Sequence, residues 1–161
     1  MAWLRDARAM EEQSETILES QIARIKHYPH LKEKLQEHLT QTRRQSTLVR
    51  DCIQRRGGNT SMIKELAAKT IATAQGLSGL FVDDEVVKGS LALITFEHME
   101  IASYRILIAA AEAIGDSQTA GVCRQILEEE EAMAAWLSDQ VPGTVAKFLK
   151  RDEIAGVQAK R

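Results

Sequence analysis

Two glutamates, Glu97 and Glu100, interrupt a stretch that is otherwise apolar on both sides, and they offer the clearest chemistry in the sequence. On a helix, a spacing of three residues places both carboxylates on one face. We expect that face to be buried, because most of the neighbouring positions are apolar. A buried carboxylate without a partner is strongly destabilising or takes up a proton. The pair therefore requires a neutralising group.

The segments that must position these glutamates are long and helical. Sparse glycine and proline residues separate them, and the connections near residues 28 and 115 are short. Short connections predict two antiparallel hairpins, and a link of about 25 residues between the hairpins is typical of a ferritin-like four-helix bundle. We therefore predict an all-α single domain over residues 1–161, with an extra linking helix between the second and third bundle helices. The predicted helices span 2–27, 30–56, 60–80 (the linking helix), 84–114 and 117–140, with a short tail helix at 144–150.

Composition supports a soluble helical protein. The chain has 161 residues, of which 44% are hydrophobic and only 4% aromatic, and it contains two prolines. The net charge of −2 gives no basic surplus, so we expect no nucleic-acid partner. No stretch approaches the roughly 18 uncharged apolar residues of a membrane span, and the start lacks the apolar centre of a signal peptide. The two isolated cysteines favour a reducing cytoplasm.

Each bundle helix carries an ionisable residue on its apolar seam, near the middle of the helix. Antiparallel packing would bring these residues to a similar depth. The predicted seams are Leu4, Glu11, Leu18 and Ile25; Leu31, Leu35, His38, Thr42, Gln45, Val49 and Cys52; Leu93, Glu97, Glu100, Tyr104, Leu107 and Ala111; and Val122, Ile126, Glu129 or Glu130, Met133 and Leu137.

Several buried carboxylates can be protonated, paired with buried bases, or bound to cations. Nearby arginines do not fall on the seams, although their long side chains could reach inward. Oxygen-rich ligands with one imidazole suit iron or manganese, and less specifically zinc or calcium. Two divalent cations would balance about four carboxylates, which is the logic of a dinuclear carboxylate site. The candidate ligands are Glu11, His38, Glu97, Glu100, Glu129 and Glu130.

Four motifs, spread in order along nearly the whole chain, carry a family resemblance. They are DARAMEEQ at 6–13, EHLTQTRRQ at 37–45, FEHMEIASY at 96–104 and EEEEAMAAWL at 128–137. Together they resemble the YciE/YciF family of bacterial ferritin-like proteins. The resemblance implies a rubrerythrin-like pair of hairpins, a role in the stress response and a homodimer. It also implies that the candidate ligands above match the family's helix acids and its histidine.

The sequence departs from the usual diiron pattern. Such sites place Glu-x-x-His on two helices, but Leu35 lies three residues before His38, and the fourth helix has no histidine. Gln41 stands where relatives are expected to carry an acid, and its neutral amide would lower the ligand charge. One metal ion, a weaker pair and a site that has lost its metal all remain open.

Three functions are therefore considered. The first is a metal-binding ferritin-like protein, with redox activity unproven and Tyr104 as the candidate proton donor. The second is a non-enzymatic interaction scaffold with a vestigial acidic core. The third is a metal-free hydrolase or binding module, for which only RRGGNTS at 55–61 offers a weak anion-binding pattern. The first accounts best for the acids on the seams.

Overall fold

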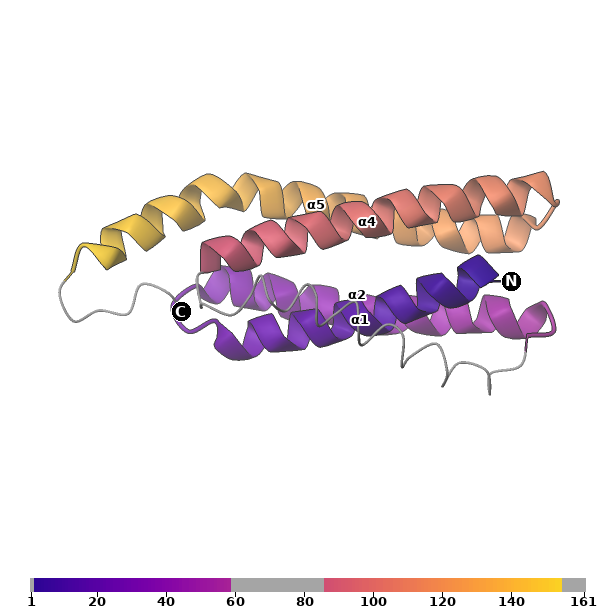
Figure 1. Cartoon of the computed structure of the whole chain (residues 1–161), viewed down its shortest axis with the longest axis horizontal. Coiled ribbons are helices and arrows are strands. Elements are labelled where there is room, and N and C mark those ends of the chain that lie inside the picture. The colour runs from indigo at the N-terminus through magenta and orange to yellow at the C-terminus, as the bar shows by residue number, and fades with distance from the viewer. Residues whose placement is uncertain (1, 59–85, 155–161) are drawn as a thin grey trace.

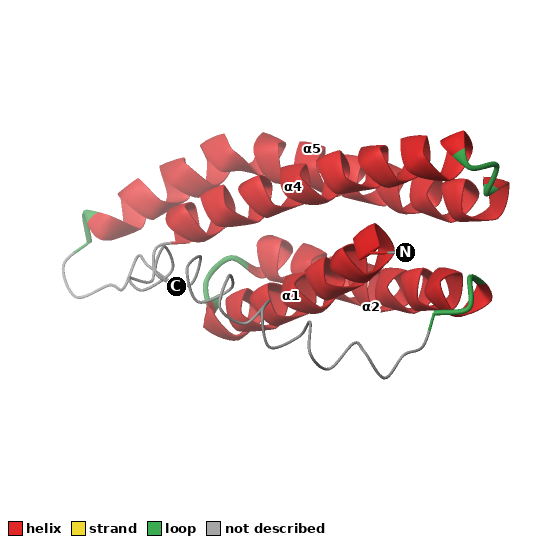
Figure 2. Cartoon of the chain, turned by 45° about the vertical axis from the view of Figure 1, so that its right-hand side comes forward, coloured by secondary structure: helices red, strands yellow, loops and turns green. Residues whose placement is uncertain are grey.

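The computed structural model describes residues 2–58 and 86–154, and every regular element in those two ranges is an α-helix. The expected all-α, ferritin-like bundle of two antiparallel hairpins is confirmed (Figures 1 and 2). The predicted linking helix at 60–80 lies outside the described residues. The four helices are α1 (Ala2–Arg24), α2 (Pro29–Arg55), α4 (Val86–Ala113) and α5 (Ser117–Asp152).

Each hairpin packs mainly within itself, and the two hairpins then lie side by side. Helix α1 runs along α2, and α4 runs along α5 (Figure 1). Between the hairpins, α1 contacts α4 and α2 contacts α5. All four helices therefore face one shared interior.

The short connections are explained by local chemistry. Pro29 begins α2, and the residue before a proline avoids helical geometry, so Tyr28 lies outside both helices. Helix α1 ends at Arg24, three residues before the predicted position. At the other end of the bundle, Gly115 adopts a left-handed φ of 73°. The next residue, Asp116, caps α5 by accepting a hydrogen bond from the Thr119 amide at 3.0 Å. Asp116 also pairs with Arg55 at 3.2 Å, which links the two hairpins.

The predicted end of the last helix near residue 140 is wrong, because α5 continues through Pro142 to Asp152 and absorbs the expected tail helix. Proline removes one helical hydrogen bond and bends a helix without always ending it, and α5 curves in its C-terminal part (Figure 1). Contacts beyond the bend hold this part in place. Lys147 donates to the His27 carbonyl at 2.6 Å and lies over the Tyr28 ring, while Phe148 packs against the core.

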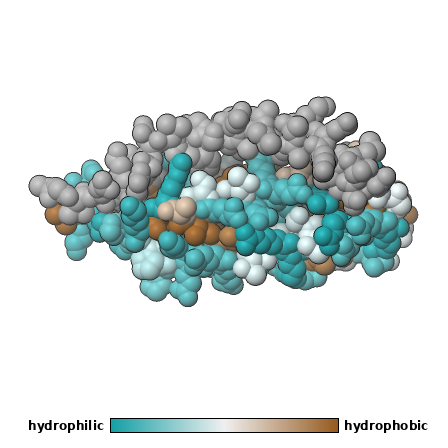
Figure 3. Space-filling model, turned by 90° about the horizontal axis from the view of Figure 1, so that it is seen from below, coloured by the Kyte–Doolittle hydropathy of each residue, from teal (hydrophilic) through white to brown (hydrophobic). Residues whose placement is uncertain are grey.

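The interior consists of two apolar clusters with polar residues between them. One cluster includes Leu4, Val49, Cys52, Leu107, Cys123 and Ile126, and the other includes Leu18, Ile25, Leu31, Leu35, Met133 and Leu137. All residues of the predicted seams are buried except Val122, which is half-buried, and Glu129. The described surface seen from the side of α1 and α2 is mostly hydrophilic, with a narrow hydrophobic strip (Figure 3). The helical periodicity therefore assigned the inner face of each helix correctly.

Candidate metal centre

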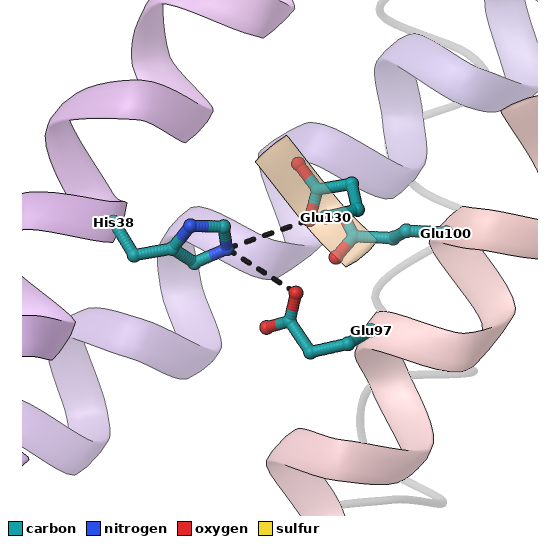
Figure 4. A group of neighbouring side chains, drawn as sticks. All are labelled: His38, Glu97, Glu100 and Glu130. Carbon is teal, nitrogen blue, oxygen red and sulfur yellow. Dashed lines mark ion pairs between the residues drawn. The ribbon is translucent and has the colours of Figure 1, made fainter. Parts of the chain in front are cut away.

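Four side chains from three helices meet in the polar layer between the apolar clusters. His38 comes from α2, Glu97 and Glu100 from α4, and Glu130 from α5 (Figure 4). Each offers one nitrogen or oxygen atom, and these four atoms all lie within 4.8 Å of one another. None of the four residues is more than 1% exposed. This is the group of candidate ligands that the structure brings together.

The imidazole faces the carboxyl groups from the α2 side of this group (Figure 4). His38 Nε2 is 3.4 Å from Glu97 Oε2 and 3.5 Å from Glu130 Oε2, which are ion-pair distances (Figure 4). Glu100 points into the same space from one helical turn beyond Glu97. The three-residue spacing on α4 thus places both carboxyl groups on one buried face, as predicted from the sequence.

Glu11 and Glu129 differ from the other candidates. Glu11 is fully buried on α1, where it accepts a hydrogen bond from the Tyr104 hydroxyl, but it is not one of the four clustered residues. Glu129 turns away from the interior, with 19% of its side chain exposed, and pairs with Arg44. Glu130 is therefore the inward-facing residue of the two that the sequence could not distinguish. Whether any of these residues binds metal stays a prediction.

Burial and mutual repulsion raise the pKa of the carboxyl groups. Burial, followed by the charge of Glu130, raises the pKa of Glu11 to about 8, although the Tyr104 hydroxyl opposes the shift. Burial raises the pKa of Glu97 to about 7 against the effect of His38. The pKa of Glu100 is raised by burial and then by the charge of Glu11. Near neutral pH, Glu11 therefore largely keeps its proton and Glu97 is only partly ionised.

His38 compensates part of the negative charge. Burial alone would lower the pKa of this imidazole, but the acidic side chains of Glu130 and Glu97 close to its Nε2 raise it to about 11. Without a metal ion, His38 is therefore an imidazolium that faces Glu97 and Glu130. One buried cation for this many acids leaves the remaining charge to protons or to metal ions.

Polar atoms without hydrogen-bond partners point to what this interior can hold. Among the described residues, the buried atoms at the centre without a partner are His38 Nε2, Glu11 Oε2, Gln45 Oε1, Glu97 Oε2, both Glu100 oxygens and Glu130 Oε2. Buried polar atoms are normally hydrogen-bonded, so such a concentration calls for an explanation. Carboxylate oxygens with one imidazole nitrogen are a ligand set that iron, manganese and zinc accept. The residues present therefore fit a metal ion.

The sequence analysis missed the roles of two glutamines on α2. Gln41 was expected to change the charge of the ligand set, but its Oε1 instead lies 3.1 Å from His38 Nδ1, on the side of the ring away from the cluster. Gln45 is fully buried and donates from Nε2 to Glu130 Oε1 at 2.6 Å. The spacing 38, 41, 45 is the helical signal that could have revealed both contacts.

The remaining histidines and cysteines lie outside the cluster. His27, His30 and His98 are exposed. The Nδ1 of His98 is 2.8 Å from the Ile94 carbonyl. Cys52 and Cys123 are buried and free, and burial raises the pKa of Cys123 to about 12. Both thiols therefore behave as small apolar core residues.

The fold and the buried cluster together define a ferritin-like helical bundle with an acidic interior. The family described as a domain of unknown function, DUF892, matches residues 1–150, so the chain belongs to this family. A crystallised protein from Xanthomonas campestris (XCC3681) is 36% identical, with 95% of each chain covered and a TM-score of 0.79.

The Escherichia coli stress protein YciF has the same fold. It is 24% identical, with 90% of this chain and 93% of that chain covered, and its TM-score is 0.74. The resemblance to the YciE/YciF family expected from the four motifs is thereby confirmed. None of the described helices is both long and apolar enough to cross a membrane.

Proposed function

We propose that this chain is a metal-binding, ferritin-like protein of the bacterial stress response, and that the cluster of His38, Glu97, Glu100 and Glu130 holds iron or manganese. The observation that carries the proposal is a set of ligand atoms without hydrogen-bond partners, all within 4.8 Å of one another in a buried interior. A metal cation would satisfy these atoms and neutralise the carboxylates together. The likeness to a stress protein supports the physiological setting.

A second ion would use the acid on α1. The charge of Glu130 helps to raise the pKa of Glu11, and the charges of Glu11 and Glu130 help to raise the pKa of Glu100, so these three side chains lie near one another. With four glutamates and one histidine available, two divalent cations would balance the charge. We therefore include a dinuclear site, with Glu11 as the ligand from the first helix. Glu129 is not included, because it pairs with Arg44 at the surface.

The chain's own groups would hold the ion and manage protons. A bound iron or manganese ion would supply Lewis-acid and one-electron redox chemistry. Tyr104 is fully buried and holds a proton at Glu11, and burial raises the pKa of its hydroxyl well above the usual value. Tyr104 is thus a neutral proton donor beside the cluster.

Metal analysis of protein purified without chelators tests the proposal. After reconstitution with Fe(II) or Mn(II) and desalting, we expect about one to two equivalents of metal, as for a mononuclear or dinuclear carboxylate site. A variant with Glu97 and Glu100 both changed to glutamine should retain almost none. Failure of the folded natural protein to retain either metal would contradict the proposal.

An alternative function is a non-enzymatic scaffold with a vestigial acidic core. The observation that favours it is the internal neutralisation already present, with His38 between Glu97 and Glu130 and with Glu11 bonded to Tyr104. This alternative predicts no change in melting temperature on adding metal ions. The metal-binding function predicts a rise, because a ligand that binds only the folded state stabilises it.

A homodimer in the cytoplasm completes the proposal. Large apolar side chains on the outer side of α4, including Leu91 and Ile106, are 65% and 56% exposed, and Trp3 on α1 is 58% exposed. A helix that is apolar on most sides is normally covered. Light scattering coupled to size-exclusion chromatography should give twice the mass of the chain, and a monomer at micromolar concentration would contradict the dimer.

A further inference from the structure

Two amide side chains on α2 contact the candidate ligands from behind. Gln41 lies one helical turn after His38, and its Oε1 is 3.1 Å from His38 Nδ1. Gln45 lies one turn further on, and its Nε2 is 2.6 Å from Glu130 Oε1. The other atoms of these two ligands, His38 Nε2 and Glu130 Oε2, face each other across the cluster.

The Gln41 contact determines which ring nitrogen faces the cluster. An amide oxygen can only accept a hydrogen bond, so Nδ1 must carry the proton in this contact. The lone pair available to a cation is then at Nε2, which already lies 3.4 Å from Glu97 Oε2. The ring can lose its Nε2 proton to admit a cation without breaking the bond to Gln41.

The Gln45 contact similarly separates the two oxygens of Glu130. The Gln45 NH₂ group donates to Glu130 Oε1 and also to Glu129 Oε2, at 2.8 Å. Glu130 Oε2 has no hydrogen-bond partner and points towards His38. Glu129 also pairs with Arg44 through its other oxygen. Gln45 and Arg44 together hold the Glu129 carboxylate outside the cluster. Gln45 therefore contacts both the inward carboxylate of Glu130 and the outward carboxylate of Glu129.

We propose that Gln41 and Gln45 are positioning residues that select His38 Nε2 and Glu130 Oε2 as the ligand atoms for the cation; this rests on the proposed metal-binding function. Groups that orient a metal ligand from behind typically change metal affinity by about 10–100-fold when they are removed. Gln41 also sets the strength of the imidazole ligand. A neutral acceptor at Nδ1 makes the ring a weaker base than a carboxylate would, so replacing the amide with an acid should strengthen binding.

The test is a titration of metal-free full-length protein with Co(II), followed by its visible absorption. Gln41→Leu removes the acceptor at a half-buried position with little risk to the fold, and Gln41→Glu replaces it with a stronger one. Gln36→Leu is the matched control on the same helix, because Gln36 is exposed. It lies two positions before His38, a rotation of about 200°, and therefore on the opposite side of α2. Gln45→Leu probes the second contact.

We expect Gln41→Leu and Gln45→Leu to weaken Co(II) binding by about 10–100-fold and to alter the absorption bands. Gln41→Glu should bind at least as tightly as the natural protein, a rescue that a merely structural role would not produce. Gln36→Leu should be unchanged. Binding and spectra in both leucine variants identical to those of the natural protein would overturn the inference and leave the proposed function intact. Failure of the natural protein to bind Co(II) would instead overturn the proposed function, and the inference with it.

Nitrogen-15 NMR of the natural protein loaded with Zn(II) gives a measurement that needs no variant. Because Zn(II) is diamagnetic, the shifts of both His38 nitrogens can be read directly. We expect Nδ1 to carry a proton and Nε2 to show the shift of a metal-bound nitrogen. Zinc on Nδ1, with the proton on Nε2, would overturn the inference even if Gln45→Leu does not fold.

Discussion

Tyr104 of α4 donates its hydroxyl hydrogen to Glu11 of α1, so a buried polar bond joins the two hairpins next to the cluster. Both residues are completely buried. An acceptor buried this deeply depends on its donor, since water cannot replace it. The bond thus holds α1 against α4 and also affects the pKa of the Glu11 carboxyl group.

Removing the Tyr104 hydroxyl should destabilise the metal-free protein. In Tyr104→Phe, Glu11 loses its only described donor, and we expect the free energy of unfolding to fall by about 1–3 kcal/mol. Urea denaturation of chelator-treated protein measures this. In a Glu11→Leu background the same substitution should have a much smaller effect, because the partner is absent. Equal losses of unfolding free energy in the two backgrounds would show that the bond between Tyr104 and Glu11 does not contribute to stability.

The stability of the metal-free protein should fall as pH rises. The pKa of Glu11 is raised from 4.5 to about 8 and that of Glu97 from 4.5 to about 7, so the folded protein holds protons that the unfolded chain releases. The stabilising effect of His38, whose pKa rises from 6.5 to about 11, is complete below pH 6.5 and is lost as pH rises through 11. All three groups act in the same direction above pH 6.5.

Melting curves of chelator-treated protein in buffers between pH 5 and 8.5 check this expectation. The melting temperature should decrease steadily across the range defined by the raised carboxyl pKa values. A melting temperature that rises towards pH 8 would mean that the carboxylates are ionised and stabilised in the folded state. That result would contradict the charge balance described above.

Metal binding should release protons. The ligand atoms must be deprotonated to bind a cation, yet the pKa values of Glu97 and His38 are raised to about 7 and about 11. The affinity for Mn(II) or Fe(II) should therefore increase with pH between 6 and 8. Calorimetric titrations in buffers with different ionisation enthalpies count the protons released. No release at pH 6.5 would be inconsistent with binding at this cluster.

Three adjacent glutamates on α5 provide a graded test of the site. Glu130→Gln removes a carboxylate from the cluster and should weaken metal binding by more than about tenfold. Tenfold is about the smallest loss of affinity seen when a group that only orients a metal ligand is removed, and a ligand itself should matter more. Glu129→Gln breaks the pair with Arg44 at the surface and should have a smaller effect. Glu128→Gln is the control, because this residue is exposed. Equilibrium titration with Mn(II) ranks the three, and equal affinities would exclude Glu130 as a ligand.

The sequence predicted the bundle and its inner faces because both follow from periodicity. The seven-residue spacing of apolar residues identified the buried stripes, including the positions of Glu11 and His38. It failed at Pro142, where contacts from Lys147 and Phe148 to other parts of the protein outweigh the local preference of proline. It also failed to choose between Glu129 and Glu130, since a rotation of about 100° separates neighbouring positions on a helix and both fit a loose stripe.

The contacts within the centre depend on distances between helices, which periodicity does not contain. The bond between Tyr104 and Glu11 spans 93 positions in the sequence, and the bond between Gln45 and Glu130 spans 85. Gln41 was interpreted as a change in ligand charge because relatives are expected to carry an acid at this position. The structure instead places its amide behind the imidazole. Residue types alone could not distinguish these two roles.

An anomalous-difference map from crystals of the Mn(II)-loaded protein tests the central claim most directly. The account predicts a peak among His38, Glu97, Glu100 and Glu130, within coordination distance of their nitrogen and oxygen atoms. A second peak next to Glu11 would indicate a dinuclear site. A loaded, well-ordered crystal with no peak in this cluster, or with manganese only at the surface, would contradict it.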